Sequence, residues 1–485
     1  RIDVVEGERD RSFGPADAEL RATVRINDPA AWRGPLRGSV GLGEGYVAGL
    51  WETDDLVTLM RIAARELREL DGMRGLIARP RGAWHRLRGL VPRNDHDGAR
   101  AHIAAHYDLG NDLFESFLDQ RMMYSCAYFP SDAATLDEAQ LAKLDRICDK
   151  LRLGPDVHLL EIGTGWGGMA IHAAQRSGCR VTTTTISRAQ HELASQRVRA
   201  AGLEDRITVL LEDYRDLEGR YDRLVSVEMI EAVGWQYFDE YFRRCDQLLT
   251  EDGAMLLQAI TIDDDLYEIE KAAKSFANTH VFPGGCLPSE GLIASCLRRV
   301  TSMRQVWVDD ITAHYPPTLA AWRERFFSAW ERLRGRGYDE RFRRLWDFYL
   351  SSSEAGFRER RIGEERRGDD DAVAEVVDAV ADQDHEPRAA VVVVMVVAGT
   401  GTGAAPRRDG PRVHRMVVLG LVGRVVVGLV AVAVAPQHEL LEQEEPEQPD
   451  QHDDHHMVRV RDLERVRHEL EEHRAEQRAD REAHE

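Results

Sequence analysis

Short apolar runs in the middle of the chain alternate with segments whose apolar residues recur at helical spacing. Runs of this length predict strands, and their alternation with helices is typical of a parallel sheet in an α/β fold. Five strands are expected, at 157–163, 179–187, 206–214, 221–230 and 254–262. Gly253 stands just before the last run, where glycine can end a helix in the left-handed conformation. We therefore predict a doubly wound, Rossmann-like sheet.

The pattern divides the chain into three regions. Residues 1–95 are rich in Arg and Gly and contain one amphipathic stretch, 54–70, so we expect a small N-terminal helical accessory domain. A loop signal at 91–98 separates this region from the sheet region, 96–363. In the remainder, 364–485, no Phe, Tyr, Trp, Ile, Lys, Asn, Ser or Cys occurs. Because it has no aromatic anchors, this low-complexity tail is expected to be disordered.

The tail contains two valine-rich runs, at 389–399 and 416–435, followed by a block of Asp, Glu, Gln, His and Arg. The second run has the length of a membrane-spanning helix. However, Arg424 stands in its middle, and Gly and Val are weak helix formers. We favour a disordered extension or a segment translated out of frame, with a membrane anchor as the alternative.

Charge and cysteine usage narrow the class of protein. The net charge is −21, and the tail has 28 Asp and Glu against 15 Arg, so it accounts for −13 of that total. The rest of the chain is close to balanced, which argues against a nucleic-acid partner. Six scattered cysteines without a C-x-x-C pair indicate reduced thiols rather than disulfides or a metal site. No secretory signal follows Arg1, so we expect a cytoplasmic protein.

A glycine-rich segment, Glu-Ile-Gly-Thr-Gly-Trp-Gly-Gly at 161–168, lies between a predicted strand and a predicted helix. Glycines there let the backbone approach a bound ligand closely. The form E-x-G-x-G-x-G favours S-adenosylmethionine over a dinucleotide. The residues expected to bind the cofactor at this loop are Glu161, Gly163, Gly165 and Gly167, with Glu161 orienting the methionine amino group.

The next two strands complete the predicted cofactor site. A dinucleotide-binding strand would end in an acid that holds the ribose, whereas this one ends in Thr185 and Ser187 with Gln190 following. These three neutral residues are expected to bind the ribose of S-adenosylmethionine. Asp213 and Tyr214 close the third strand, where a carboxylate can accept from the adenine amino group. The alternative for Asp213 is a helix N-cap.

Several motifs in one order resemble the cyclopropane-fatty-acyl-phospholipid synthase family over about residues 15–363. They are HYDLGNDLF (106–114), MMYSCAYFP (122–130), LLEIGTGWGG (159–168), VEMIEAVG (227–234), FPGGCLPS (282–289) and FYLSSSEAGFRERRIG (348–363). The resemblance implies a class I S-adenosylmethionine methyltransferase fold. It also implies methyl transfer to a cis double bond of a phospholipid acyl chain, with bound bicarbonate as the general base that removes a proton from the resulting cation.

The resemblance also implies the catalytic residues, which hold the bicarbonate. They are the backbone amide of Cys126, Glu231, Gln258, the backbone of Ile260, and Tyr349, and Tyr124 and Ser125 join the cofactor-binding set. Gln258 departs from the family, in which many members carry histidine. An amide can donate to an anion but cannot titrate near neutral pH. From the residues alone, Cys126 and Tyr349 suit a core equally well.

Alternatives remain for the reaction. The cation could instead give a methylene- or methyl-branched chain, with a separate reductase as partner, or the chain could be a small-molecule N- or C-methyltransferase or a non-catalytic lipid-binding protein. We expect unsaturated phospholipid acyl chains as the substrate, a peripheral position on the inner face of the membrane, and leave a homodimer open. The apolar slot would be lined by Met122, Met123, Phe129, Phe282 and the aromatics of 324–333, which also suit plain core packing. His106 and His280 are more typical of packing residues than of a base.

Overall fold

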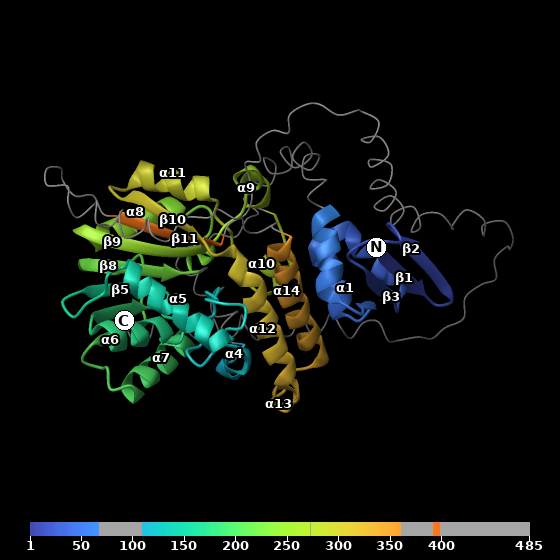
Figure 1. Ribbon diagram of the computed structural model, residues 1–485, viewed down its shortest axis with the longest axis horizontal. Coiled ribbons are helices and arrows are strands. Elements are labelled where there is room, and N and C mark those ends of the chain that lie inside the picture. The colour runs from blue at the N-terminus through green and yellow to red at the C-terminus, as the bar shows by residue number, and fades with distance from the viewer. Residues whose placement is uncertain (67–108, 272, 360–390, 398–485) are drawn as a thin grey trace, which may run out of the picture. The chain divides into compact units, whose positions relative to one another are not determined.

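The computed structural model describes residues 1–66, 109–271, 273–359 and 391–397. Its larger sheet has seven strands in the order β10-β11-β9-β8-β5-β6-β7, and all neighbouring strands are parallel (Figure 1). The strands are β5 (His158–Ile162), β6 (Arg180–Thr184), β7 (Ile207–Leu210), β8 (Tyr221–Val227), β9 (Leu249–Ile260), β10 (Arg304–Asp310) and β11 (Val391–Val397). The doubly wound sheet is confirmed, and the five predicted strands are β5 to β9.

The prediction for Gly253 is wrong, because β9 begins at Leu249 and the glycine lies inside the strand. The pairing of β8 with β9 jumps from Tyr221↔Leu249 to Arg223↔Ala254, so extra residues of β9 bulge out at this point. A Cβ on Gly253 would stand 2.8 Å from the carbonyl oxygen of Thr250. A side chain would not fit at this position, so the tight β-bulge requires a glycine.

Helices cover both faces of this sheet and form two buried apolar clusters. Successive strand residues point to opposite faces, so Leu159 belongs to one cluster and Leu160 to the other. One face carries α5 (Leu136–Lys150), α6 (Gly168–Ser177) and α7 (Arg188–Ala200), and the other carries α8 (Phe238–Leu248) and α11 (Glu290–Val300) (Figure 1). α5 begins with a capping box in which Thr135 and Glu138 bond each other's backbone amides.

Further helices extend the first cluster beyond the sheet. The longest, α14, packs against α12, which also contacts α4 (Figure 1). These helices are α4 (Asn111–Phe117), α10 (Phe276–His280), α12 (Tyr315–Ser328), α13 (Trp330–Arg334) and α14 (Glu340–Arg358). The short α9 (Asp264–Glu270) instead contacts α11 and belongs to the second cluster. The aromatic residues of α4, α12 and α14 interleave, as in the edge-to-face pair of Phe117 and Trp322 at 6.0 Å. They wall the region where the carboxyl ends of the strands meet.

The N-terminal region holds helices, as predicted, together with a four-stranded sheet that was not expected. The sheet order is β2-β1-β3-β4. Its strands are β1 (Ile2–Glu6), β2 (Arg9–Phe13), β3 (Ala22–Ile26) and β4 (Trp51–Thr53), accompanied by α1 (Gly38–Val47) and a helix described from Leu56 to Glu66. α1 packs on α14, where the buried hydroxyl of Tyr46 donates to Asp347 at 2.8 Å. The boundary predicted at residues 95 and 96 lies outside the described residues.

The tail contributes a strand to one half of the large sheet. β11 lies between β9 and β10, paired with both through its backbone. For these seven residues the structure differs from the predicted disordered tail. The reason is that a β-branched valine run has high strand propensity and can fill a gap between two strands without aromatic residues. The run at 416–435 lies outside the described residues.

Candidate active site

The glycine-rich loop joins β5 to α6 in the backbone conformation that its sequence requires. Gly163, Gly165 and Gly167 all have positive φ, at 104°, 52° and 83°. L side chains rarely adopt these angles. A Cβ on Gly165 would meet no atom within 4 Å, so space is open beside it, whereas a Cβ on Gly163 would stand 3.3 Å from Met229. The loop therefore leaves room for a ligand and lies against the segment that follows β8.

Glu161 lies beneath this loop, at the end of β5. Its side chain is 3% exposed and accepts a hydrogen bond from the hydroxyl of Thr183 at 2.6 Å. Burial raises the pKa of Glu161 to about 8, and the Thr183 hydroxyl opposes this only in part. The Thr183 hydroxyl also bonds that of Thr164 in the loop, at 2.7 Å. Glu161 is thus linked to the glycine loop through two hydroxyls.

The three predicted ribose-binding residues come together at the end of β6. The Thr185 hydroxyl donates to the Gln190 side-chain oxygen at 2.7 Å and accepts from the Ser187 amide at 3.1 Å. Ser187 is the N-cap of α7 and accepts from the Gln190 amide. All three residues are buried, and these hydrogen bonds hold them to one another. The structure therefore groups them as predicted, and their binding to ribose stays a prediction.

Asp213 is buried, and its two carboxylate oxygens face the guanidinium of Arg215 at 2.8 and 2.7 Å. It also accepts from the Arg215 amide, so it closes a turn and no helix begins here. The N-cap alternative is therefore wrong. Tyr214 packs edge-to-face on Tyr241, with ring centroids 5.5 Å apart. Sequence reasoning did not anticipate that Arg215 would neutralise Asp213.

Two glutamates at the end of β8 meet the end of β9. Glu228, three residues before Glu231, accepts from the Cys126 amide and from the Gln258 side-chain amide, both at 2.9 Å. Its other oxygen accepts from the Tyr315 hydroxyl at 2.8 Å. The carboxylate of Glu228 is thus held by three donors, and the residue is only partly buried. We refer to Cys126, Glu228, Glu231, Gln258, Ile260 and Tyr315 as the carboxylate cluster.

Glu231 reaches the same cluster from η3 (Ile230–Ala232). One of its oxygens accepts from the Ile260 amide at 2.5 Å, and the other is a buried atom with no hydrogen-bond partner. Burial, followed by the nearby charge of Glu228, raises the pKa of Glu231 to about 8. Burial also raises the pKa of Glu228, although its hydrogen-bond donors and Lys143 oppose this. At neutral pH Glu231 therefore carries a proton, whereas the Glu228 carboxylate is the one that three donors hold.

Aromatic side chains stand beside the cluster. The Tyr124 and Tyr349 hydroxyls are 3.0 Å apart, and the Phe282 ring lies 6.2 Å from the Tyr124 ring and 5.6 Å from the Tyr349 ring. Tyr315 stacks on Phe357 with centroids 4.1 Å apart. Tyr349 is therefore near the predicted site, with its hydroxyl against that of Tyr124. These rings present an apolar and aromatic wall to the carboxylates.

Ser125 is buried, and its hydroxyl accepts from the buried ammonium of Lys143 at 2.6 Å, which leaves the hydroxyl hydrogen to donate. Burial lowers the pKa of Lys143 to about 8, while Glu228 and Asp119 favour its charged form. Lys143 thus supplies a positive charge behind the cluster. Sequence reasoning missed it, as it missed Glu228 and Tyr315. The one available signal was the second acid in VEMIEAVG.

Of the residues predicted to line the substrate slot, some lie in the aromatic wall beside the carboxylate cluster and others lie in the protein core. Met122 and Met123 are buried, Phe282 faces the tyrosines, and Phe129 lies against His314. In the segment 324–333, the buried aromatic is Phe326, which packs within the core. His106 lies outside the described residues. All six cysteines are buried, and their reduced state stays a prediction.

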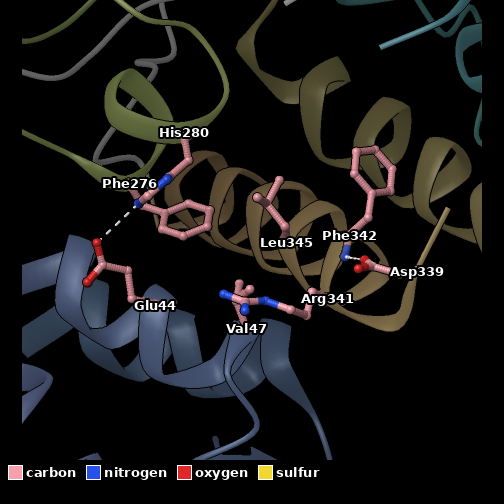
Figure 2. A pocket seen from close by; sticks show the side chains of 8 residues that line it. All are labelled: Glu44, Val47, Phe276, His280, Asp339, Arg341, Phe342 and Leu345. Atoms are coloured by element: carbon pink, nitrogen blue, oxygen red, sulfur yellow. Dashed lines mark hydrogen bonds and ion pairs between the residues drawn. The ribbon is translucent and has the colours of Figure 1, made fainter. Parts of the chain in front are cut away.

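A separate apolar pocket of about 340 Å³ lies between α1, α10 and α14 (Figure 2). Its lining residues are Glu44, Val47, Phe276, His280, Asp339, Arg341, Phe342 and Leu345. The His280 Nε2 atom and a Glu44 carboxylate oxygen lie 3.4 Å apart across its rim. His280 therefore joins two helices, as expected of a packing residue, and is not part of the carboxylate cluster.

Comparisons with known proteins agree with this geometry. The family model of mycolic acid cyclopropane synthetase matches residues 94–364. Tuberculostearic acid methyltransferase UfaA1 of Mycobacterium tuberculosis is 40% identical over 343 residues, covering 68% of this chain and 78% of that protein. Cyclopropane-fatty-acyl-phospholipid synthase of Escherichia coli is 39% identical over 344 residues, covering 70% and 86%.

Solved structures give the same result for the fold. Mycolic acid cyclopropane synthase CmaA1, crystallised with SAH and CTAB, has a TM-score of 0.51 and 31% identity, covering 56% of this chain and 96% of that one. Coclaurine N-methyltransferase, bound to N-methylheliamine and SAH, has a TM-score of 0.51 at 22% identity, covering 65% and 94%. The predicted methyltransferase fold is confirmed.

Proposed function

The chain belongs to the mycolic acid cyclopropane synthetase family, and we propose that it methylates a cis double bond in an acyl chain of an unsaturated phospholipid, closing a cyclopropane ring. It is an S-adenosylmethionine-dependent methyltransferase, as predicted. What we propose beyond this is the lipid that it methylates, the product that it forms and the place in the cell where it acts.

One observation carries the proposal: a carboxylate cluster and an aromatic wall meet beside the glycine loop. Methylation of an alkene leaves a carbocation on an apolar chain. Such a cation is stabilised by the faces of aromatic rings, and Tyr124, Phe282 and Tyr349 supply them. It must then lose a proton, and the Glu228 carboxylate is an acceptor in the same place.

The described residues fit S-adenosylmethionine, which supplies an electrophilic methyl group when bound. Three positive-φ glycines let the backbone pass close to it, and the space beside Gly165 is open. Glu161 and the group at the end of β6 would orient the methionine and ribose moieties. Asp213 and Tyr214 would lie at the adenine, with the charge of Asp213 balanced by Arg215.

A branched product is the second candidate, because the 40% identical relative is named a tuberculostearic acid methyltransferase. The same cation, losing a proton from a carbon of the acyl chain, gives a methylene branch that a separate reductase would have to saturate. A soluble-amine substrate is supported only by the shared fold with the N-methyltransferase.

We place the enzyme at the cytoplasmic face of the membrane, where its lipid substrate lies. Among the residues that the structure describes, no helix is both long enough and apolar enough to cross a bilayer. The proposal is peripheral association with that face, and a homodimer is left open.

The experiment uses the full chain with S-adenosylmethionine and vesicles of a cis-unsaturated phospholipid. Mass spectrometry should find acyl chains that have gained one CH₂ unit, and proton NMR should find cyclopropane rather than vinylidene hydrogens. Vesicles of a saturated phospholipid with the same head group are the control. No gain on any unsaturated phospholipid, with methylation of a soluble amine instead, would contradict the proposal.

A further inference from the structure

The carboxylate cluster does not fit the bicarbonate that the family resemblance led us to expect. The hydrogen-bond donors gathered there are already used by the chain's own carboxylates. The Cys126 amide, the Gln258 amide group and the Tyr315 hydroxyl donate to Glu228, and the Ile260 amide donates to Glu231. The Gln258 amide group also donates to the Cys126 carbonyl, at 3.3 Å.

Two buried atoms of the cluster have no hydrogen-bond partner, the second oxygen of Glu231 and the side-chain oxygen of Gln258. The first carries the Glu231 proton at neutral pH, and the second can only accept. Turning the Gln258 amide over would place its oxygen against the Glu228 carboxylate and the Cys126 carbonyl, so the orientation described is the favourable one. A bicarbonate ion would therefore meet the Glu228 carboxylate where it needs donors, and the Glu231 hydroxyl is the donor that this cluster still offers.

We propose that Glu228 occupies the anion position and is itself the base that completes the reaction. This inference rests on the proposed function. The π electrons of the double bond form a bond to the methyl carbon as the carbon–sulfur bond breaks, and its electrons remain on sulfur. A hydrogen of the transferred methyl group then leaves as a proton to a Glu228 oxygen, and the C–H electron pair closes the ring.

The surroundings of Glu228 suit this role better than those of Glu231. Three donors and the nearby Lys143 ammonium favour the ionised form of Glu228 and oppose the burial that raises its pKa, whereas Glu231 accepts from the Ile260 amide and has a pKa raised to about 8. Glu228 also lies next to Met229, which lies against Gly163 of the cofactor loop. The residue is only partly buried, so the proton can pass to solvent when the product leaves.

The test measures the bicarbonate dependence of the wild-type chain and of two variants. Release of SAH and formation of cyclopropane are followed with unsaturated phospholipid vesicles, in buffer stripped of CO₂ and again after adding bicarbonate. The wild type should work at the same rate in both buffers. Glu228→Gln should lose about 10²-fold or more of its cyclopropane-forming rate in either buffer, the scale of a lost general base.

Glu228→Gly separates this role from a structural one. Glycine accepts the φ of 47° at this position and frees the three donors. Added bicarbonate should then occupy the vacated place and raise the rate of this variant by about tenfold or more. Binding of S-adenosylmethionine, measured by calorimetry, should match the wild type in both variants.

Glu359→Gln is the control. It removes a carboxylate that pairs with Arg61 and Arg65 outside the cluster, so its rate should be that of the wild type and should not respond to bicarbonate. The inference is overturned if the wild-type rate falls on removal of bicarbonate, if Glu228→Gln keeps its rate, or if Glu228→Gly binds the cofactor yet ignores bicarbonate. Failure of the wild type to modify any lipid in either buffer would overturn the proposed function and this inference together.

Discussion

Replacing Glu161 by Gln should change how the stability of the cofactor-free protein depends on pH. The wild-type carboxyl is almost completely buried, and its pKa is raised from 4.5 to about 8 because burial disfavours the charged form. Between these two values the folded protein holds a proton that the unfolded chain has released. The stability that this proton contributes is therefore fully present below the pKa of Glu161 in the unfolded chain, and it is lost as the pH rises through about 8.

The size of the effect follows from the shift. One pKa unit corresponds to roughly 1.4 kcal/mol, so the folded state loses on the order of 4 kcal/mol between about pH 5 and about pH 8 through Glu161 alone. The glutamine that replaces it cannot ionise, and its side-chain oxygen can still accept from the Thr183 hydroxyl. The variant should therefore match the wild type near pH 5 and be more stable by a few kcal/mol near pH 8.

Urea denaturation without cofactor, at several pH values across this range, measures the difference. The pKa of Glu231 is raised into the same pH range, so Glu231 also contributes to the pH dependence of stability. Because this residue is partly exposed, its contribution is smaller, and the stability of the variant should still fall with pH on a shallower slope. Glu212→Gln removes an exposed carboxylate just beyond β7 and should leave the wild-type pH profile unchanged. Parallel pH profiles for the wild type and Glu161→Gln would refute the reasoning, because they would mean that Glu161 is ionised in the folded protein.

Gly165→Val should abolish S-adenosylmethionine binding in calorimetry. The backbone φ of 52° is unfavourable for valine, and the valine side chain would fill the open space beside the loop. The control is Gly154→Ala, at a glycine with negative φ and no neighbour within 4 Å, and this variant should bind normally. A chain ending after Val397 should keep the melting temperature of the full chain, and one ending after Gly363 should melt several degrees lower, because β9 and β10 lose the strand between them. Equal melting temperatures for the two truncated chains would mean that β11 adds no stability.

Most of the large sheet could be predicted because β5, β7, β8 and β9 contain short apolar runs and most of these strands alternate with helices along the chain. β10 was not predicted, since its polar sequence RQVWVDD lacks such a run and its place depends on neighbouring strands. The N-terminal sheet was missed for the same reason, because β2 reads RDRSF. Strands of this kind are specified by their partners rather than by their own pattern.

The cofactor residues were predictable because glycine loops and strand ends are local features of the sequence. The sequence does not reveal which of the polar atoms at this site form hydrogen bonds with one another. Asp213 is matched by Arg215 two residues later, and Ser125 by Lys143 on α5, so the oxygens of both side chains already accept hydrogen bonds within the chain. Hydrogen-bond partners across elements become visible only in three dimensions.

The conformation of Glu228 explains how two acids three residues apart reach one cluster. β8 ends at Val227, and a non-glycine residue with φ of 47° then turns the chain into η3, so that Glu231 returns toward the end of β9. This conformation costs a non-glycine residue roughly 1 kcal/mol or more, which a glycine would avoid. Position 228 therefore holds a strained glutamate, although a glycine would adopt the same conformation without strain. The two carboxylate oxygens of this glutamate accept hydrogen bonds from three donors. A role that requires its carboxylate accounts for that cost, whereas packing alone does not.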